Sequence, residues 1–217
     1  MEQYILVIVR FAKYKRRLSI LKRFIWIGLF SIIFVLSACS DNLPIETDMS
    51  ENVANFSFTN QDNETVERDD LAGNWWLADF IFTNCETVCL PMTNNMAALQ
   101  VELDDKGIPI QFVSFSVDPE YDQPDVLKEY AEDYDVNFDN WHFLTGYDFQ
   151  TIRKLSIKSF RAPLKEPAYG SDQVTHDIRF FLVDPEGNIV KGYEGTNQAT
   201  MDEIVDDLLV LNENGLL

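Results

Sequence analysis

Two cysteines four residues apart have the clearest chemical potential of any side chains in this sequence. They lie in Cys85-Glu-Thr-Val-Cys89, between an apolar stretch that ends at Phe82 and a helical pattern that starts near Met92. If a helix begins near Cys85, the two side chains share one face, about 5–6 Å apart at Cβ. The partial positive charge of a helix N-terminus favours thiolate over thiol, and thiolates bind soft metals and attack disulfides. The position therefore predicts a reactive site.

Besides a reactive site, two structural roles remain open for Cys85 and Cys89. A C-x-x-x-C pattern also arises when two cysteines fill a core, and a permanent disulfide is compatible with an exported chain. The whole chain has three Cys and two His, so a zinc site with several ligands would use nearly all of them. The same count excludes a disulfide-dense secreted fold.

The two histidines differ in their surroundings. His176 follows residues 161–175, where two prolines and a glycine predict an exposed loop, and it precedes a strand pattern that starts at Ile178. His142 lies between two aromatic residues and is expected to pack or to face solvent. A lone histidine is more often structural than ligating, so the residues by themselves leave the role of His176 open.

The periodicity of apolar residues predicts the elements that position these side chains. Residues 75–82 are almost entirely apolar or aromatic, which is typical of a central strand buried on both faces. Met92 and Met96 begin a run of apolar residues at helical spacing that extends to Leu103, so both methionines are expected in the core and not on a metal. Residues 110–117 predict a second buried strand.

The remaining patterns complete the order of elements. They are a hairpin over residues 56–66, a helix from Pro124, a strand over 141–144, a helix after Asp148, strands over 178–183 and 189–193, and a helix from Thr200. Strands that alternate with helices and end in a hairpin and a helix predict an α/β fold with a mixed sheet.

The first 38 residues differ in charge from the rest of the chain. They carry seven Lys or Arg and one acid, whereas residues 39–217 carry ten and thirty-five. Residues 24–36 are uncharged, but a comfortable bilayer span needs about 20 residues, so this stretch predicts the apolar region of a signal peptide. An uncleaved membrane anchor is the alternative. In both cases the residues that follow lie outside the cytoplasm.

Leu36-Ser37-Ala38-Cys39 comes directly after that stretch and resembles the lipobox of bacterial lipoproteins. The resemblance implies cleavage before Cys39 and lipidation of Cys39, which would hold the protein at the outer face of the bacterial cytoplasmic membrane. We therefore expect a signal peptide over residues 1–38, an acidic tether over 39–55 and one folded domain over 56–217. The acidity of the exported part argues against nucleic acid as a partner; it serves solubility, or it attracts cations or a basic partner surface.

Several motifs, in order, resemble the Sco/SenC family of copper-binding cytochrome c oxidase assembly proteins. They are Asp79-Phe-Ile-Phe-Thr-Asn-Cys85-Glu-Thr-Val-Cys89, Phe115-Ser-Val-Asp-Pro119, Phe143-Leu-Thr-Gly146, and Val174-Thr-His176 followed by Phe181-Leu-Val-Asp-Pro-Glu-Gly187. The resemblance extends from about Phe56 to Leu209. It implies a thioredoxin-like fold with a central mixed sheet flanked by helices, an N-terminal hairpin and an inserted loop before the ligand histidine. Leu90 departs from the pattern, because many members have proline directly after the second cysteine.

By position, the family's copper ligands correspond to Cys85, Cys89 and His176. Two thiolates suit Cu(I), and an added imidazole lets the same site hold Cu(II). Asp79 and Asp177 are candidates for orienting a ligand or tuning the charge around the metal. The alternative is that both are solvated or turn-stabilising acids.

The resemblance implies a copper metallochaperone and not an enzyme. Such a protein, expected to be a monomer, would deliver copper to the dinuclear site in the copper-bearing subunit of cytochrome c oxidase. The alternative is a thiol–disulfide oxidoreductase that acts on cysteines of an oxidase subunit, or a redox sensor. His176 favours copper, because thiol exchange does not need an imidazole, and the usual redox pair is C-x-x-C. The two roles can coexist, since the same thiols serve both.

Overall fold

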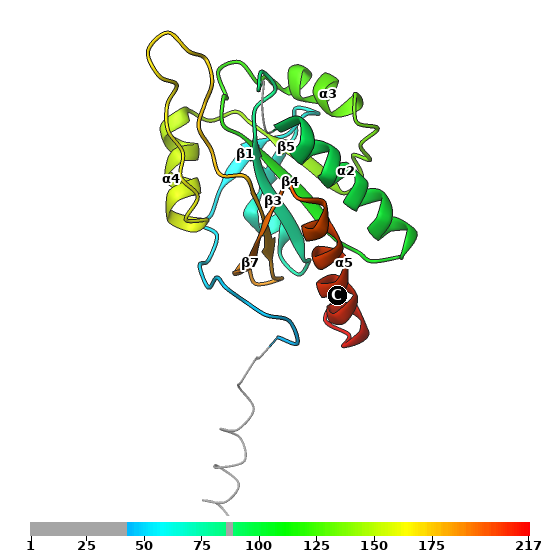
Figure 1. Ribbon diagram of the computed structural model, residues 1–217. Coiled ribbons are helices and arrows are strands. Elements are labelled where there is room, and N and C mark those ends of the chain that lie inside the picture. Colours follow the sequence, from blue (N-terminus) through cyan, green and yellow to red (C-terminus); the bar gives the residue numbers. More distant parts are fainter. Residues whose placement is uncertain (1–42, 86–88) are drawn as a thin grey trace, which may run out of the picture. The chain divides into compact units, whose positions relative to one another are not determined.

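A five-stranded sheet forms around β3, Trp76–Ile81, in the computed structural model, which describes residues 43–85 and 89–217 (Figure 1). The strand order is β5-β4-β3-β6-β7, with β4 at Gln111–Ser116, β5 at Trp141–Leu144, β6 at Arg179–Val183 and β7 at Ile189–Glu194. β4 runs parallel to β3 and β5, whereas β6 runs antiparallel to β3 and β7. This arrangement confirms the expected α/β fold with a mixed sheet.

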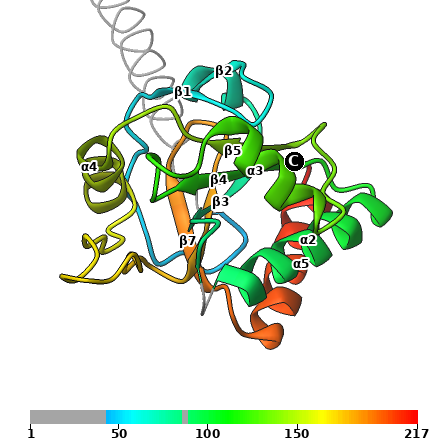
Figure 2. The same ribbon diagram turned by 90° about the horizontal axis from the view of Figure 1, so that it is seen from above.

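Helices cover both faces of the sheet. α2, Cys89–Asp105, and α5, Gln198–Glu213, lie side by side on one face, and α4, Phe149–Ser159, lies on the opposite face (Figures 1 and 2). α3, Pro124–Glu132, packs beside β5 at the sheet edge. One turn of 3-10 helix, η1, spans Arg68–Leu71. The central sheet is therefore flanked by helices, as the motif resemblance implied.

Alternation along β3 divides the core into two layers. Phe80 and the other even-numbered side chains pack with α4 and the N-terminal hairpin, whereas Ile81 and the odd-numbered apolar side chains pack with α2 and α5. All six residues of β3 are buried, which confirms the predicted central strand. Because full burial of a large apolar side chain contributes about 1.5–3 kcal/mol, β3 is a firm base for the residues that follow it.

The N-terminal hairpin pairs β1, Ser57–Thr59, with β2, Thr65–Glu67, in antiparallel register, as predicted. The side-chain oxygen of Asn60 accepts two main-chain N–H groups within the turn, at 3.0 and 2.9 Å. Reciprocal main-chain hydrogen bonds between Thr59 and Thr145, at 3.0 and 2.8 Å, attach the hairpin to the segment after β5. The hairpin therefore extends one layer of the core.

The last helix begins earlier than the sequence predicted. α5 starts at Gln198 and not at Thr200, because the side chain of Asn197 accepts a main-chain N–H of the first turn at 3.1 Å. An asparagine in this position satisfies a donor that the helix leaves without an internal acceptor. The predicted apolar face is buried all the same, with Ile204 and Leu208 in the core.

Residues 43–55 were expected to lie in a tether, and the structure differs. Val53 is buried, and its main-chain N–H donates to the carbonyl of Gly187 at 2.9 Å. The N–H of Asp48 donates to the carbonyl of Val190 in β7 at 3.1 Å. Because apolar side chains are interspersed among its acids, residues 43–55 pack against the folded domain.

Residues 161–175 form the irregular loop predicted before His176. Main-chain hydrogen bonds between Lys165 and Thr175, at 2.9 and 3.2 Å, close its base. The expected signal peptide over residues 1–38 and the lipidation site at Cys39 lie outside the described residues. Within residues 43–85 and 89–217, no helix has the length and apolar character required to cross a bilayer.

Candidate metal centre

The two thiols of the C-x-x-x-C segment meet where β3 gives way to α2. Cys85 and Cys89 are buried and carry thiols rather than a disulfide, and the Cys89 N–H donates a hydrogen bond to Cys85 Sγ at 3.4 Å. Main-chain N–H groups at a helix start lack internal acceptors, and here a sulfur fills that role. The two sulfurs therefore lie close together where α2 begins, at Cys89, with Cys85 four residues before it.

A buried carboxylate anchors the residues just before Cys85. Asp122 accepts the Thr83 main-chain N–H at 3.2 Å, the Thr83 hydroxyl at 2.5 Å and the Ser116 hydroxyl at 2.6 Å. Burial raises the pKa of Asp122, and the three donors oppose that rise. We call residues 83–85 together with Cys89 the Cys arm. No sequence pattern singles out Asp122, because its contact joins residues 39 positions apart.

His176 reaches the thiols from a distant part of the chain. Its Nε2 lies 3.3 Å from Cys89 Sγ, and its Nδ1 lies 2.8 Å from the main-chain oxygen of Asp177. Because a carbonyl only accepts, Nδ1 carries the ring proton and Nε2 offers its lone pair towards the thiols. Phe82 meets the imidazole edge to face, with ring centroids 5.8 Å apart. We call residues 161–176 the His arm.

The three donor atoms fit a soft metal ion. Cys85 Sγ, Cys89 Sγ and a ring nitrogen of His176 all lie within 4.8 Å of one another. Sulfur and nitrogen ligands at about 2.0–2.3 Å from a common ion lie roughly 3.5–4.6 Å apart. The spacing is therefore close to what a single ion requires, and the donor set matches copper or zinc better than magnesium or calcium.

The metal-free pair favours the protonated thiol at Cys89. The neighbouring Cys85 sulfur, followed by burial, raises the pKa of Cys89 far above its ordinary value. This direction is opposite to the sequence expectation of a thiolate at a helix start, and the adjacent sulfur and the loss of solvent are its largest causes. A cysteine binds metal as thiolate, so occupation of this centre displaces a proton from Cys89.

Asp177 contacts His176 through its backbone, while its carboxylate faces Arg179. The Arg179 guanidinium donates to the two carboxylate oxygens at 2.9 and 2.8 Å, and the Arg179 N–H donates at 2.9 Å. The carboxylate of Asp177 therefore links the end of the His arm to Arg179 at the start of β6. Asp177 contacts the His176 imidazole through its main-chain carbonyl oxygen.

Asp79 is a buried acid on the α2 side of β3. It is fully buried, and among the described residues neither of its carboxylate oxygens has a hydrogen-bond partner. Burial raises the pKa of Asp79 to about 7. The charge of Asp79 in turn contributes to the raised pKa of Cys89, so this acid acts on the centre through space.

The other residues considered in the sequence analysis lie in the core or at the surface. Met92 and Met96 are fully buried under α2, which confirms their assignment to the core. His142 lies partly buried on β5. Leu90, at the position of the departure from the family pattern, has 49% of its surface exposed, and its carbonyl accepts the Asn94 side chain at 3.0 Å. Among the described residues, His142 does not belong to the cluster formed by Cys85, Cys89 and His176.

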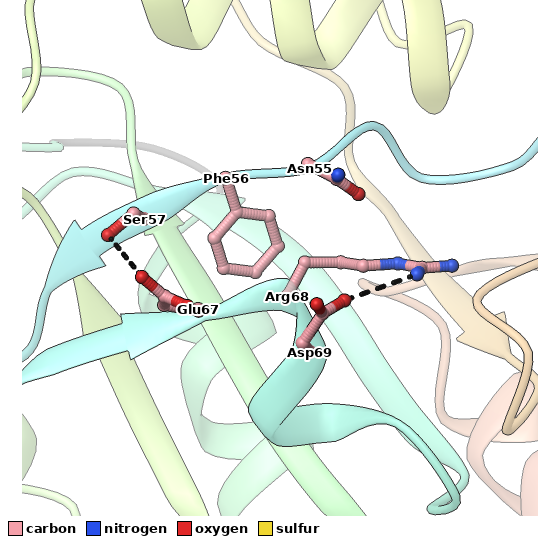
Figure 3. Close-up of a pocket in the computed structure, with 6 residues that line it drawn as sticks. All are labelled: Asn55, Phe56, Ser57, Glu67, Arg68 and Asp69. Atoms are coloured by element: carbon pink, nitrogen blue, oxygen red, sulfur yellow. Dashed lines mark hydrogen bonds and ion pairs between the residues drawn. The ribbon is translucent and has the colours of Figure 1, made fainter.

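A surface pocket lies elsewhere, beside the N-terminal hairpin (Figure 3). It is lined by Asn55, Phe56, Ser57, Glu67, Arg68 and Asp69. Ser57 Oγ donates to Glu67 at 3.2 Å, and Arg68 pairs with Asp69 at 3.6 Å. The lining contains no thiol or imidazole, so the chemistry of the centre does not extend to this pocket.

Comparison with known proteins places these features in a family. The family model described as SCO1/SenC matches residues 45–211. A relative from Bacillus subtilis, named SCO1 protein homolog, is 44% identical over 177 residues, which make up 82% of this chain and 91% of the relative.

Solved structures agree with the sequence match. A SCO1/SenC family lipoprotein from Bacillus anthracis has a TM-score of 0.72 and 40% identity, over 75% of this chain and 96% of that chain. BsSco, described as a Sco family member with a disulfide switch, has a TM-score of 0.70 and 46% identity, over 76% and 95%. Copper-bound ScoI from Bradyrhizobium japonicum has a TM-score of 0.61 and 26% identity, over 75% and 98%. These likenesses confirm the thioredoxin-like fold.

Proposed function

The chain belongs to the SCO1/SenC family, and from that premise we propose that it binds copper through Cys85, Cys89 and His176 and delivers it during assembly of cytochrome c oxidase. One observation carries the proposal. Two sulfurs and an imidazole nitrogen, supplied by residues far apart in the sequence, lie within 4.8 Å of one another. If the two cysteines only filled the core, there would be no need for a histidine nitrogen beside their sulfurs.

The donor set suits copper in both oxidation states. Soft thiolates select Cu(I), and an imidazole adds a ligand that Cu(II) accepts. Support comes from the copper-bound ScoI and from BsSco, which is described as belonging to a family of cytochrome c oxidase assembly proteins. The recipient in this proposal is the copper-bearing subunit of the oxidase.

The three ligands play different parts in delivery. Both cysteines are buried, whereas His176 is partly exposed, so a ligand from a recipient protein reaches copper most easily from the imidazole side. We therefore propose that the recipient replaces His176 first and the thiolates afterwards. Protons returning to Cys89, whose pKa is raised in the metal-free protein, assist the final release.

Copper titration of the full chain in detergent tests the binding step. The reduced, metal-free protein is titrated anaerobically with Cu(II), while sulfur-to-copper absorption and electron paramagnetic resonance are recorded. We expect a one-to-one endpoint, lost in Cys89→Ala and weakened at least tenfold in His176→Ala. If Cu(II) only oxidises the thiols, and His176→Ala behaves like the wild type, the three-ligand site is wrong.

Delivery has its own test. The copper-loaded chain is mixed with the metal-free copper-bearing subunit, and the appearance of the dinuclear copper spectrum is followed. Transfer faster than from an equal concentration of free copper supports a chaperone. Binding without such an advantage would reduce the proposal to copper storage.

A thiol–disulfide oxidoreductase is the second candidate, favoured by one observation. The two thiols lie close together, since the Cys89 N–H donates to Cys85 Sγ and the donor atoms of the cluster lie within 4.8 Å of one another, so formation of a disulfide needs only a small rearrangement. The relative BsSco is described as having a disulfide switch. If the metal-free reduced chain reduces an oxidised cysteine pair in the oxidase subunit, and His176→Ala retains that activity, the redox role is primary.

We also propose that residues 1–38 are a signal peptide, that lipidated Cys39 anchors a monomer at the outer face of the cytoplasmic membrane, and that the residues after Cys39 connect the lipid to the folded domain. The B. anthracis neighbour is described as a lipoprotein, which supports this part. Cys39→Ala is expected to release the protein from the membrane fraction or to block its processing. Unchanged membrane association and an unchanged mass would favour the uncleaved anchor.

A further inference from the structure

Two surface hydrogen bonds join the loop that bears Cys85 to the loop that bears His176. The Asn84 Nδ2 donates to the Asp172 carboxylate at 2.8 Å, and Gln173 Nε2 donates to the Asn84 main-chain carbonyl at 3.0 Å. Asn84 directly precedes one proposed copper ligand, and Gln173 lies three residues before another. We call Asn84, Asp172 and Gln173 the Asn84 clamp.

The His arm has few other attachments near its return to the core. Main-chain pairing of Lys165 with Thr175 closes its base, and Val174 packs into the core. Between these points, residues 166–172 are exposed throughout. Among the described residues, the Asn84 clamp ties the end of this exposed segment to the Cys arm through two hydrogen bonds.

We propose that the Asn84 clamp positions His176 relative to the two thiols and thereby sets the preference of the centre for Cu(II) over Cu(I). This proposal rests on the proposed copper site and deepens it. Asn84, Asp172 and Gln173 are positioning residues, because they act on copper only through the arms that they join.

The two oxidation states of copper need different ligands. Thiolates suffice for Cu(I), whereas Cu(II) depends on the harder imidazole nitrogen. A His arm that samples other positions must be ordered when Cu(II) binds, and the binding-competent fraction reduces the apparent affinity in proportion. Loss of a solvent-exposed hydrogen bond of ordinary strength changes such an equilibrium about three- to tenfold. We therefore expect a selective effect of that size on Cu(II).

The test compares four variants of the full chain in detergent. Asn84→Ala and Asp172→Ala remove the side-chain bond of the clamp, while Asp172→Asn keeps an acceptor oxygen and removes the charge. Gln150→Ala is the matched control, because Gln150 Nε2 donates to Glu166 at 2.9 Å and ties the same loop to α4. Cu(I) and Cu(II) affinities are measured separately by competition with chelators.

The expected result is a shift in the balance between the two oxidation states. Asn84→Ala and Asp172→Ala should weaken Cu(II) binding about three- to tenfold and leave Cu(I) binding unchanged, which raises the reduction potential of the bound copper by about 30–60 mV. Asp172→Asn and Gln150→Ala should match the wild type. Equal losses for both oxidation states, or the same loss in Gln150→Ala, would overturn the clamp.

A metal-free measurement separates this proposal from the copper function. Hydrogen–deuterium exchange of the metal-free chain should be faster over residues 166–176 in Asn84→Ala than in the wild type or in Gln150→Ala. If the wild type binds no copper but this difference is present, the copper function fails while the positioning of the His arm stands. If hydrogen–deuterium exchange is identical in all three proteins, the proposal that the Asn84 clamp positions His176 is wrong, whether or not the protein binds copper.

Discussion

The Cys arm is anchored by a buried carboxylate, whereas the outer part of the His arm, residues 166–172, is exposed throughout. Thr83 is fixed by the buried carboxylate of Asp122, and both thiols lie in the core. His176 is partly exposed and ends a loop whose outer residues face solvent. Two buried thiols beside a partly exposed imidazole would suit the proposed role of holding a metal ion and passing it on.

We expect substitutions near the two arms to differ in their effect on the free energy of unfolding. Changes beneath the Cys arm should act mainly on the free energy of unfolding, because they disturb buried groups. Changes in the His arm should act less on stability as they approach its exposed tip.

Asp79, under the Cys arm, should make stability depend on pH. Its pKa rises from 3.8 to about 7 on folding, so the folded state binds more protons between these values and stability falls as pH rises through that window. The full effect is on the order of 4 kcal/mol. Asp79→Asn should remove this loss, which urea unfolding at pH 5 and pH 8 would detect. Asp206→Asn, at an exposed site on α5, is the control, and equal pH profiles for all three proteins would contradict the prediction.

Asp122→Ala should cost about 3 kcal/mol of stability, because it leaves buried donors of Thr83 and Ser116 without their charged acceptor. Chemical denaturation measures this loss. Glu120→Ala, two residues away and exposed, should change stability little. A loss below 1 kcal/mol in Asp122→Ala would show that the Cys arm is not anchored in this way.

Val174→Ala probes the one buried anchor close to the end of the His arm. Val174 has 8% of its surface exposed and belongs to the core layer beneath α4. Removal of two methyl groups should cost about 1–2 kcal/mol, measured by denaturation. A cost as large as that of Asp122→Ala would mean that the two arms are equally well anchored.

Tyr169→Ser should have the smallest effect. The side chain is fully exposed at the loop tip, with a relative exposure of 109%, and surface substitutions of this kind change stability by less than about 0.5 kcal/mol. Copper affinity should also stay at the wild-type value in the same titration. A measurable loss of either would show that the tip contacts the centre, which contradicts the division between base and tip.

The sequence predicted local features well. The unbroken apolar run gave β3, the helical spacing of Met92 and Met96 gave the buried face of α2, and the prolines before His176 gave the exposed loop. The start of α5 was wrong by two residues, because a side-chain cap at Asn197 competes with the pattern at Thr200. Such features depend on neighbours within a few positions, which a single sequence displays directly.

The sequence by itself determined the elements, the thiol pair and, through ordered motifs, the family and its expected ligands. Only the tertiary structure decided that His176 meets Cys89, that Asp122 holds Thr83, and that the Asp177 carboxylate turns to Arg179. It also decided the burial of Asp79 and the raised pKa of Cys89. The physical reason is that burial and convergence depend on how β3, α2 and the His arm pack, and such contacts join residues that have no periodic relation along the chain.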